Sequence, residues 1–242
     1  MKKVLLFFIC SVLYSCSSFS QNEIHVVLLS GQSNMAGHGN YDELDESIKK
    51  RLEKVADRVL LSTSNNPKIE PRPLSYNKSK ASKKYNFTKH FGPELFVGLT
   101  LAEANPNQKY LLIKKAVGGT SLYGAWNTEW TQEKATIAER GEVRQKLKLY
   151  ATHIENIQRE LTFLKEKNIK HKVIGALWMQ GESDTNKEIT ATSYQDNLQK
   201  LINGYRKEIN DKKLPFVIGQ VNVMPRKYKI GPKQVREAML SI

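Results

Sequence analysis

The run Ile24-His25-Val26-Val27-Leu28-Leu29, followed by Ser30-Gly31-Gln32-Ser33, decides the fold of this chain. A continuous apolar run rich in β-branched residues predicts a strand that is buried on both faces of a sheet. The glycine and polar residues after it predict a tight loop. Further runs of this kind predict strands over residues 58–61, 110–113, 173–179 and 216–221.

Helical patterns separate these strands. Gly92-Pro93-Glu94 predicts the start of a helix, because proline is favoured in the first turn of a helix. Asn105-Pro106 predicts its end, because a proline cannot continue a helix. Apolar residues at steps of three and four predict a long helix over about residues 141–167. Two more helices are expected over residues 192–210 and 232–239. Strands that alternate with helices predict an α/β fold, here a three-layer α/β/α sandwich with a mostly parallel central sheet.

Three of the predicted strands end in polar, glycine-rich segments, at residues 31–33, 118–120 and 180–182. Ligands bind beyond the carboxyl ends of parallel strands, so these segments are expected to meet at one edge. A serine at such an end is placed to attack a bound acyl group. Glycine backbone N–H groups and a glutamine amide can donate to the oxyanion that then develops. Each segment alone is also typical of an ordinary turn, whereas the three together favour a site.

The same three segments resemble blocks of a known family. Residues 31–37 (Gly-Gln-Ser-Asn-Met-Ala-Gly), 116–121 (Ala-Val-Gly-Gly-Thr-Ser) and 178–184 (Trp-Met-Gln-Gly-Glu-Ser-Asp) resemble three blocks of the sialate O-acetylesterase-like carbohydrate acetylesterases, a branch of the SGNH hydrolase superfamily. Residues 215–239 resemble the stretch before that family's last block. The resemblance implies a flavodoxin-like SGNH fold and a serine esterase that removes acetyl groups from sugar hydroxyls.

Carried over to this chain, the resemblance implies a role for each matching residue. Ser33 is the expected nucleophile. The expected oxyanion hole consists of the Ser33 N–H, an N–H at Gly118 or Gly119, and the side chain of Gln180.

A second group of residues is expected to bind substrate or to brace loops, namely Asn34, Trp126, Glu182 and Asp184. The plainer interpretation of Glu182 and Asp184 is that they are surface carboxylates that cap the next helix. Trp126, together with Tyr123 and Trp130, either stacks on a sugar ring or packs against helices.

The sequence departs from the family in the residues that would supply the base for Ser33. The family's last block supplies an Asp and a His, spaced D-x-x-H, and this sequence has no such block before Ile242. We therefore expect a domain that is incomplete at its C-terminus and exposes apolar surface on one sheet face. The alternative is that His38 or His90, both in loops that can reach the active edge, acts as the base.

Residues 1–20 have the pattern of an export signal. Lysines at positions 2 and 3 precede an apolar stretch over residues 4–14, which is too short to cross a bilayer as a helix. Either cleavage leaves Gln21 first, or Cys16 carries a lipid anchor. Both cysteines, Cys10 and Cys16, lie in this segment, so a disulfide is not expected in the mature domain over residues 21–242. We expect a periplasmic, secreted or outer-membrane bacterial protein without a transmembrane helix in the mature chain.

The composition is that of a globular protein with a strong positive charge. Of 242 residues, 40% are hydrophobic and 26% are charged, so the chain can bury a core. The formal net charge is +14. The densest lysine cluster consists of Lys78, Lys80, Lys83, Lys84 and Lys89. This Ser/Asn-rich segment is either a solvated loop or an anion-binding patch.

Two functions from different classes stay open on the sequence alone. The first is an exported esterase acting on an acetylated carbohydrate, with acetylated xylan, another plant or algal glycan and O-acetylated sialic acid as candidate substrates. The second is a catalytically inactive glycan-binding module. A nucleic-acid partner is not expected, since the chain carries an export signal and lacks an aromatic-basic motif. The sequence has no metal-binding cluster or phosphate-cradling loop, so no cofactor is expected.

Overall fold

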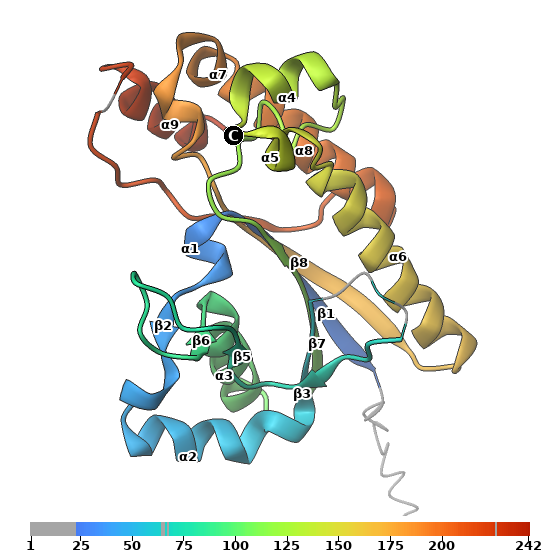
Figure 1. The fold of residues 1–242 in the computed structure, drawn as a ribbon. Helices are drawn as coiled ribbons and strands as arrows, with labels where there is room; N and C mark the ends of the chain where they lie inside the picture. The colour runs from blue at the N-terminus through green and yellow to red at the C-terminus, as the bar shows by residue number, and fades with distance from the viewer. Residues whose placement is uncertain (1–22, 64–65, 67, 226) are drawn as a thin grey trace, which may run out of the picture.

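The computed structural model describes residues 23–63, 66, 68–225 and 227–242, so the expected export segment lies outside the described residues. Its main sheet has six strands, which are β1 (Ile24–Gly31), β3 (Val59–Ser62), β4 (Arg72–Pro73), β7 (Lys109–Ala116), β8 (His171–Met179) and β9 (Phe216–Ile218). They lie in the order β4-β3-β7-β1-β8-β9 (Figure 1). Neighbouring strands are parallel except β4, which is antiparallel to β3. The mostly parallel sheet predicted from the sequence is confirmed.

Each central strand buries side chains on both faces of the sheet. Four long helices flank it, namely α2 (Glu46–Val55), α3 (Pro93–Ala104), α6 (Leu149–Glu166) and α8 (Tyr194–Ile209). In β1, Val26 and Leu28 join the core formed with α6 and α8, whereas Val27 and Leu29 join the core formed with α2 and α3. Full burial of one such side chain stabilises the fold by about 1.5–3 kcal/mol. The two helical layers complete the predicted α/β/α sandwich (Figure 1).

The other α-helices are α1 (Ser33–Ala36), α4 (Gln132–Ala138), α5 (Glu142–Gln145), α7 (Glu188–Thr192) and α9 (Gly231–Leu240). The helix expected over about residues 141–167 is therefore divided into α5 and α6. It breaks because the Leu149 N–H donates to the Ala125 carbonyl at 2.7 Å, and Lys148 before it has a non-helical backbone. The strand expected over residues 216–221 ends earlier, at Ile218.

A second, antiparallel sheet holds the lysine-rich segment. Its strands are β2 (Gly39–Asn40), β5 (Asn77–Lys78) and β6 (Lys89–Phe91), in the order β2-β6-β5. The residues between β5 and β6 form an excursion that includes Lys80, Lys83 and Lys84. The lysine cluster thus begins and ends in short strands rather than lying wholly in a loop.

The sheet face over β8 and β9 carries an apolar groove beside α3. Its volume is about 490 Å³, and its lining includes Val27, Phe96, Ile174, Leu177 and Val217. The Val217 side chain at this groove is 61% exposed. This part of the sheet face is therefore apolar and open to solvent. Within the described ranges, none of the helices has the length and apolar character needed to cross a membrane.

A buried ion pair fixes the position of α1 against the sheet. Lys114 on β7 is 5% exposed and pairs with the fully buried Glu94 on α3 at 2.5 Å. The Lys114 ammonium also donates to the Ala36 carbonyl at 2.9 Å, at the last residue of α1. Burial lowers the pKa of Lys114, and the Glu94 carboxylate acts in the opposite direction. Lys114 and Glu94 therefore connect α1, α3 and β7.

Replacing Glu94 by glutamine should destabilise the protein strongly. Glu94→Gln leaves the Lys114 ammonium buried without its counter-charge, and the expected loss in the free energy of unfolding is about 3–5 kcal/mol. Urea unfolding followed by circular dichroism measures this loss. The matched control is Glu103→Gln on the same helix, because Glu103 makes a solvent-exposed pair with Arg51, which contributes little. Equal stabilities of the two variants would contradict the assigned role of the buried pair.

Candidate active site

A cavity of about 590 Å³ lies at the carboxyl ends of β1 and β8. Its lining includes Gln32, Ser33 and Asn34 from the first segment, Gly119 from the second, and Glu182 and Ser183 from the third. The three polar segments therefore meet at one edge of the sheet. Ser33 is half-buried and is the first residue of α1.

Gly31 allows the ends of β1 and β8 to approach closely. A Cβ atom at this position would lie 2.1 Å from the Met179 carbonyl oxygen, so no other residue fits without a shift of the backbone. The Gln32 N–H then donates to that same oxygen at 3.0 Å. The turn at Gly31 therefore sets where α1 and its first residue, Ser33, begin.

The Gln32 side chain joins all three segments. Its amide nitrogen donates to the Glu182 carboxylate, and its carbonyl oxygen accepts from the Gly119 N–H and the Ser183 hydroxyl, each at 3.2 Å. The other Glu182 oxygen accepts from the Asn34 amide at 2.5 Å. Both neighbours of Ser33 are thus held by one carboxylate. Sequence reasoning missed this role of Gln32, although the residue lies inside the first block, between Gly31 and Ser33.

Gly118 and Gly119 differ in what their backbones do. A Cβ atom at Gly118 would lie 3.5 Å from the Ser33 Cβ, so the missing side chain keeps space open beside the serine. Gly119 has a φ of +74°, which favours glycine, and its N–H is directed to Gln32. Arg144 donates to the Gly118 carbonyl at 3.2 Å. Gly118 therefore lies beside Ser33, while the Gly119 N–H is already bonded to Gln32.

Gln180 does not have the environment expected of an oxyanion donor. It is 1% exposed, and its amide nitrogen donates to the Thr120 carbonyl at 3.0 Å and to the Asp184 carboxylate at 2.6 Å. These two bonds use both amide hydrogens. The structure therefore replaces the expected catalytic role of Gln180 with a bracing role between the second and third segments.

Asp184 is also a bracing residue and not a surface cap. It is fully buried, and its carboxylate accepts from the Leu122 N–H at 2.9 Å and the Tyr123 N–H at 3.0 Å. Burial raises the pKa of Asp184 to about 7, while its hydrogen-bond donors act to lower it. Together with the Gln180 bond to Thr120, the Asp184 carboxylate thus ties the loop after Gly119 to the third segment.

A second buried carboxylate holds the same loop from its other side. Glu139 is 4% exposed. One of its oxygens accepts from the Ser121 N–H at 2.9 Å, the Ser121 hydroxyl at 2.6 Å and the Ala125 N–H at 2.9 Å. The loop wall of the cavity is therefore fixed by charge-assisted hydrogen bonds, which are stronger than neutral ones.

Of the aromatic residues in this loop, Trp126 belongs to the core, whereas Tyr123 and Trp130 are only partly buried. Trp126 is fully buried and meets Trp178 edge-on, with ring centroids 5.2 Å apart. Its burial excludes the expected stacking on a sugar ring and leaves core packing as its role. Trp130 lies under the Lys148 ammonium, which is 4.4 Å from the ring centroid.

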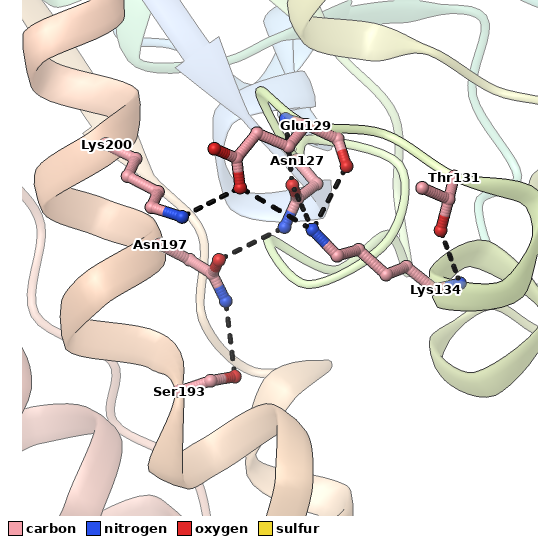
Figure 2. A network of polar contacts seen from close by, with 7 residues as sticks. All are labelled: Asn127, Glu129, Thr131, Lys134, Ser193, Asn197 and Lys200. Atoms are coloured by element: carbon pink, nitrogen blue, oxygen red, sulfur yellow. Dashed lines mark hydrogen bonds and ion pairs between the residues drawn. The ribbon is translucent and has the colours of Figure 1, made fainter.

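A network of polar side chains ties this loop to α8 (Figure 2). The Asn127 amide donates to Asn197 at 3.1 Å, and Lys200 pairs with Glu129 at 2.7 Å. Lys134 on α4 donates to the Asn127 side-chain oxygen at 3.1 Å. The network fixes α4, whose last residue, Ala138, lines the cavity, to the long helix that covers the sheet.

The two histidines considered as bases do not line the Ser33 cavity. His38 stacks on Tyr85 with ring centroids 4.2 Å apart, and His90 is 7% exposed with Nε2 3.2 Å from the Phe87 carbonyl oxygen. Both line a second cavity of about 390 Å³. Among the described residues that surround Ser33 in the first cavity, none is a histidine.

Comparisons with known proteins identify a family and a fold. A family model described as "SASA: Carbohydrate esterase, sialic acid-specific acetylesterase" matches residues 23–242. No curated protein matches the chain by sequence.

Solved structures with a similar fold include a protein from Arabidopsis thaliana, with 20% identity, a TM-score of 0.59, and coverage of 90% of this chain and 81% of that chain. XAC1771, a carbohydrate acetylesterase from Xanthomonas citri, has 17% identity, a TM-score of 0.57 and coverage of 90% and 47%. NanS has 15% identity, a TM-score of 0.58 and coverage of 91% and 74%. The chain thus spans less than half the length of the Xanthomonas protein. At these identities the likeness concerns the fold, whereas the family model covers nearly the whole described chain. The chain therefore belongs to the carbohydrate esterase family of sialic acid-specific acetylesterases.

Proposed function

We propose that the protein is a serine-dependent carbohydrate O-acetylesterase that removes acetyl groups from sugar hydroxyls. The observation that carries the proposal is the position of Ser33, which begins α1 at the wall of the 590 Å³ cavity, beside Gly118 and between two residues held by Glu182. Membership in a carbohydrate esterase family supports the same reaction class.

In the proposed reaction, the Ser33 Oγ attacks the acetyl carbonyl carbon, and its proton passes through water in the cavity to the departing sugar oxygen. The backbone N–H groups of Ser33 and Gly118 donate to the negative carbonyl oxygen of the tetrahedral intermediate. The bond to the sugar oxygen then breaks, and the sugar leaves with a proton as a free hydroxyl. Water hydrolyses the acetyl-Ser33 ester and releases acetate. No cofactor takes part in these steps.

The cavity wall favours a substrate that carries negative charge. Arg140, Arg144, Lys187 and Lys227 all line it. Two carboxylates, Glu182 and Glu139, also line the cavity. Glu182 lies beside Ser33, while one oxygen of Glu139 accepts hydrogen bonds from backbone N–H groups of the loop. A cationic wall of this kind attracts anionic ligands. Of the candidate substrates, O-acetylated sialic acid and acetylated acidic polysaccharides fit this charge better than neutral xylan does.

Export of the protein is part of the same proposal. The pattern of residues 1–20 supports release with Gln21 first or anchoring through a lipid on Cys16. Either route places the enzyme where acetylated polysaccharides occur and away from nucleic acid.

One observation favours a second candidate function, a catalytically inactive glycan-binding module. Serine is a weak nucleophile unless a neighbouring group accepts its proton, and no histidine is found among the described residues that line the Ser33 cavity. Such a module would keep the cavity and its charge without turnover.

Replacing Ser33 separates the two candidates. Hydrolysis of p-nitrophenyl acetate and release of acetate from an acetylated glycan should both fall by at least about 10³-fold in Ser33→Ala, because the nucleophile is removed. The control Ser47→Ala, at an exposed serine on α2, should retain wild-type turnover. A folded wild-type protein without Ser33-dependent turnover that still binds the glycan would instead identify the binding module.

Glu182→Gln should lower kcat more than it changes KM. Its new amide group faces the amides of Gln32 and Asn34, so both neighbours of Ser33 lose a charged acceptor. Displacement of a reacting group by about 1 Å can cost up to about 10²-fold in rate. Steady-state kinetics on p-nitrophenyl acetate measure the change, with the exposed Glu188→Gln on α7 as the control. An unchanged kcat would show that Glu182 does not position Ser33.

A further inference from the structure

The second cavity, of about 390 Å³, has lysine and histidine side chains in its wall. It is lined by Lys80, Lys114 and Lys115, by His38 and His90, and by no carboxylate among the described residues at its surface. Lys114 is matched by Glu94 behind the wall. Lys115 is half-buried, and the negative charge of Glu155 on α6 attracts its ammonium group. Lys80 is exposed at the rim, and Lys84 lies 5.0 Å from the ring centroid of Tyr85.

The uncharged part of the same wall fits a sugar. Thr63, Asn77, Ser79 and Ser82 contribute hydroxyl and amide groups, which can bond to sugar hydroxyls. Tyr85 adds an aromatic surface that is braced by the parallel His38 ring. Together with the lysines, these groups suit a polar, hydroxyl-rich ligand that carries an anionic substituent.

His90 adds an unused hydrogen-bonding group to this cluster. Its ring is packed against His38, Tyr85 and Phe87. Nε2 faces the Phe87 carbonyl, while Nδ1 is buried without a hydrogen-bond partner among the described residues. Buried polar atoms are normally paired, so an unpaired one in a cavity wall is typical of a group that a ligand or water completes.

The two cavities adjoin through α1 and the end of β7. Ser33, the first residue of α1, lines the first cavity, and Ala36, its last residue, lines the second. Three residues of helix advance about 4.5 Å along its axis. In the segment after β7, Val117 lines the second cavity and Gly119 the first. A single glycan chain can therefore reach both.

We propose that the second cavity binds an anionic sugar residue, bearing a carboxylate or a sulfate, that neighbours the acetylated residue on the same glycan. The link to the acetylated residue rests on the proposed function, whereas binding of the anionic sugar does not require Ser33. The lysine-rich segment over residues 78–89 is then an anion-binding patch.

The test is a set of binding measurements by isothermal titration calorimetry on the full mature chain. The probes are a galacturonate oligosaccharide, a sulfated carrageenan oligosaccharide, a neutral xylo-oligosaccharide and a single-stranded DNA of matched charge. The variants are Lys80→Gln and His38→Ala, both at exposed side chains, with Lys212→Gln between α8 and β9 as the matched control. Circular dichroism establishes that each variant is folded.

The wild type and Lys212→Gln should bind at least one anionic oligosaccharide about tenfold more tightly than the neutral one. Lys80→Gln and His38→Ala should lose about this factor. Preference for galacturonate or for carrageenan identifies the carboxylate or the sulfate as the bound group. Equal binding of neutral and anionic sugars, unchanged binding in both variants, or equal binding of DNA would overturn the proposal. Ser33→Ala should bind these unacetylated probes as the wild type does, so a failure of the esterase proposal leaves this result intact.

Discussion

The central position of β1 is the constraint on which the rest of the structure depends. It is paired along its length with β7 on one side and with β8 on the other, and its side chains alternate between two cores. A shift of this strand by one residue would exchange every side chain between the two faces. Its register therefore also fixes where Gly31 meets Met179, and with it the start of α1 and the position of Ser33.

Around that fixed point the site is assembled from hydrogen-bonded polar groups, of which Asp184 and Glu139 are buried. Glu182 holds the neighbours of Ser33, and Asp184 and Glu139 hold the loop that carries the glycines. Removing a carboxylate from water is costly unless its oxygens accept hydrogen bonds. In this site the carboxylate oxygens accept hydrogen bonds mainly from backbone N–H groups and side-chain amides of the loops. The loops at the carboxyl end of the sheet are thus held in place by these hydrogen bonds.

The sequence was most informative where burial alone decides structure. The runs that became β1, β7 and β8 are apolar on both faces, and little except a covered parallel sheet can accommodate them. Prediction failed where one tertiary contact overrides local preference. The long helix is broken because the Leu149 N–H bonds to the Ala125 carbonyl. For Trp126 the sequence left two roles open, and its edge-on contact with Trp178 in the core decides between them. Gln180 has the chemistry of an oxyanion donor, but Thr120 and Asp184 occupy its hydrogens, and no local pattern in the sequence reveals such partners.

The apolar groove over β8 and β9 has a consequence for how the protein behaves in solution. The formal net charge of +14 makes copies of the chain repel one another, and this repulsion keeps exposed apolar faces such as that of Val217 apart. The repulsion reaches about 10 Å at 0.1 M salt but only about 3 Å at 1 M, whereas salt does not weaken apolar contact. The tendency of the protein to self-associate therefore depends on ionic strength. Low salt favours separate molecules, and high salt favours self-association.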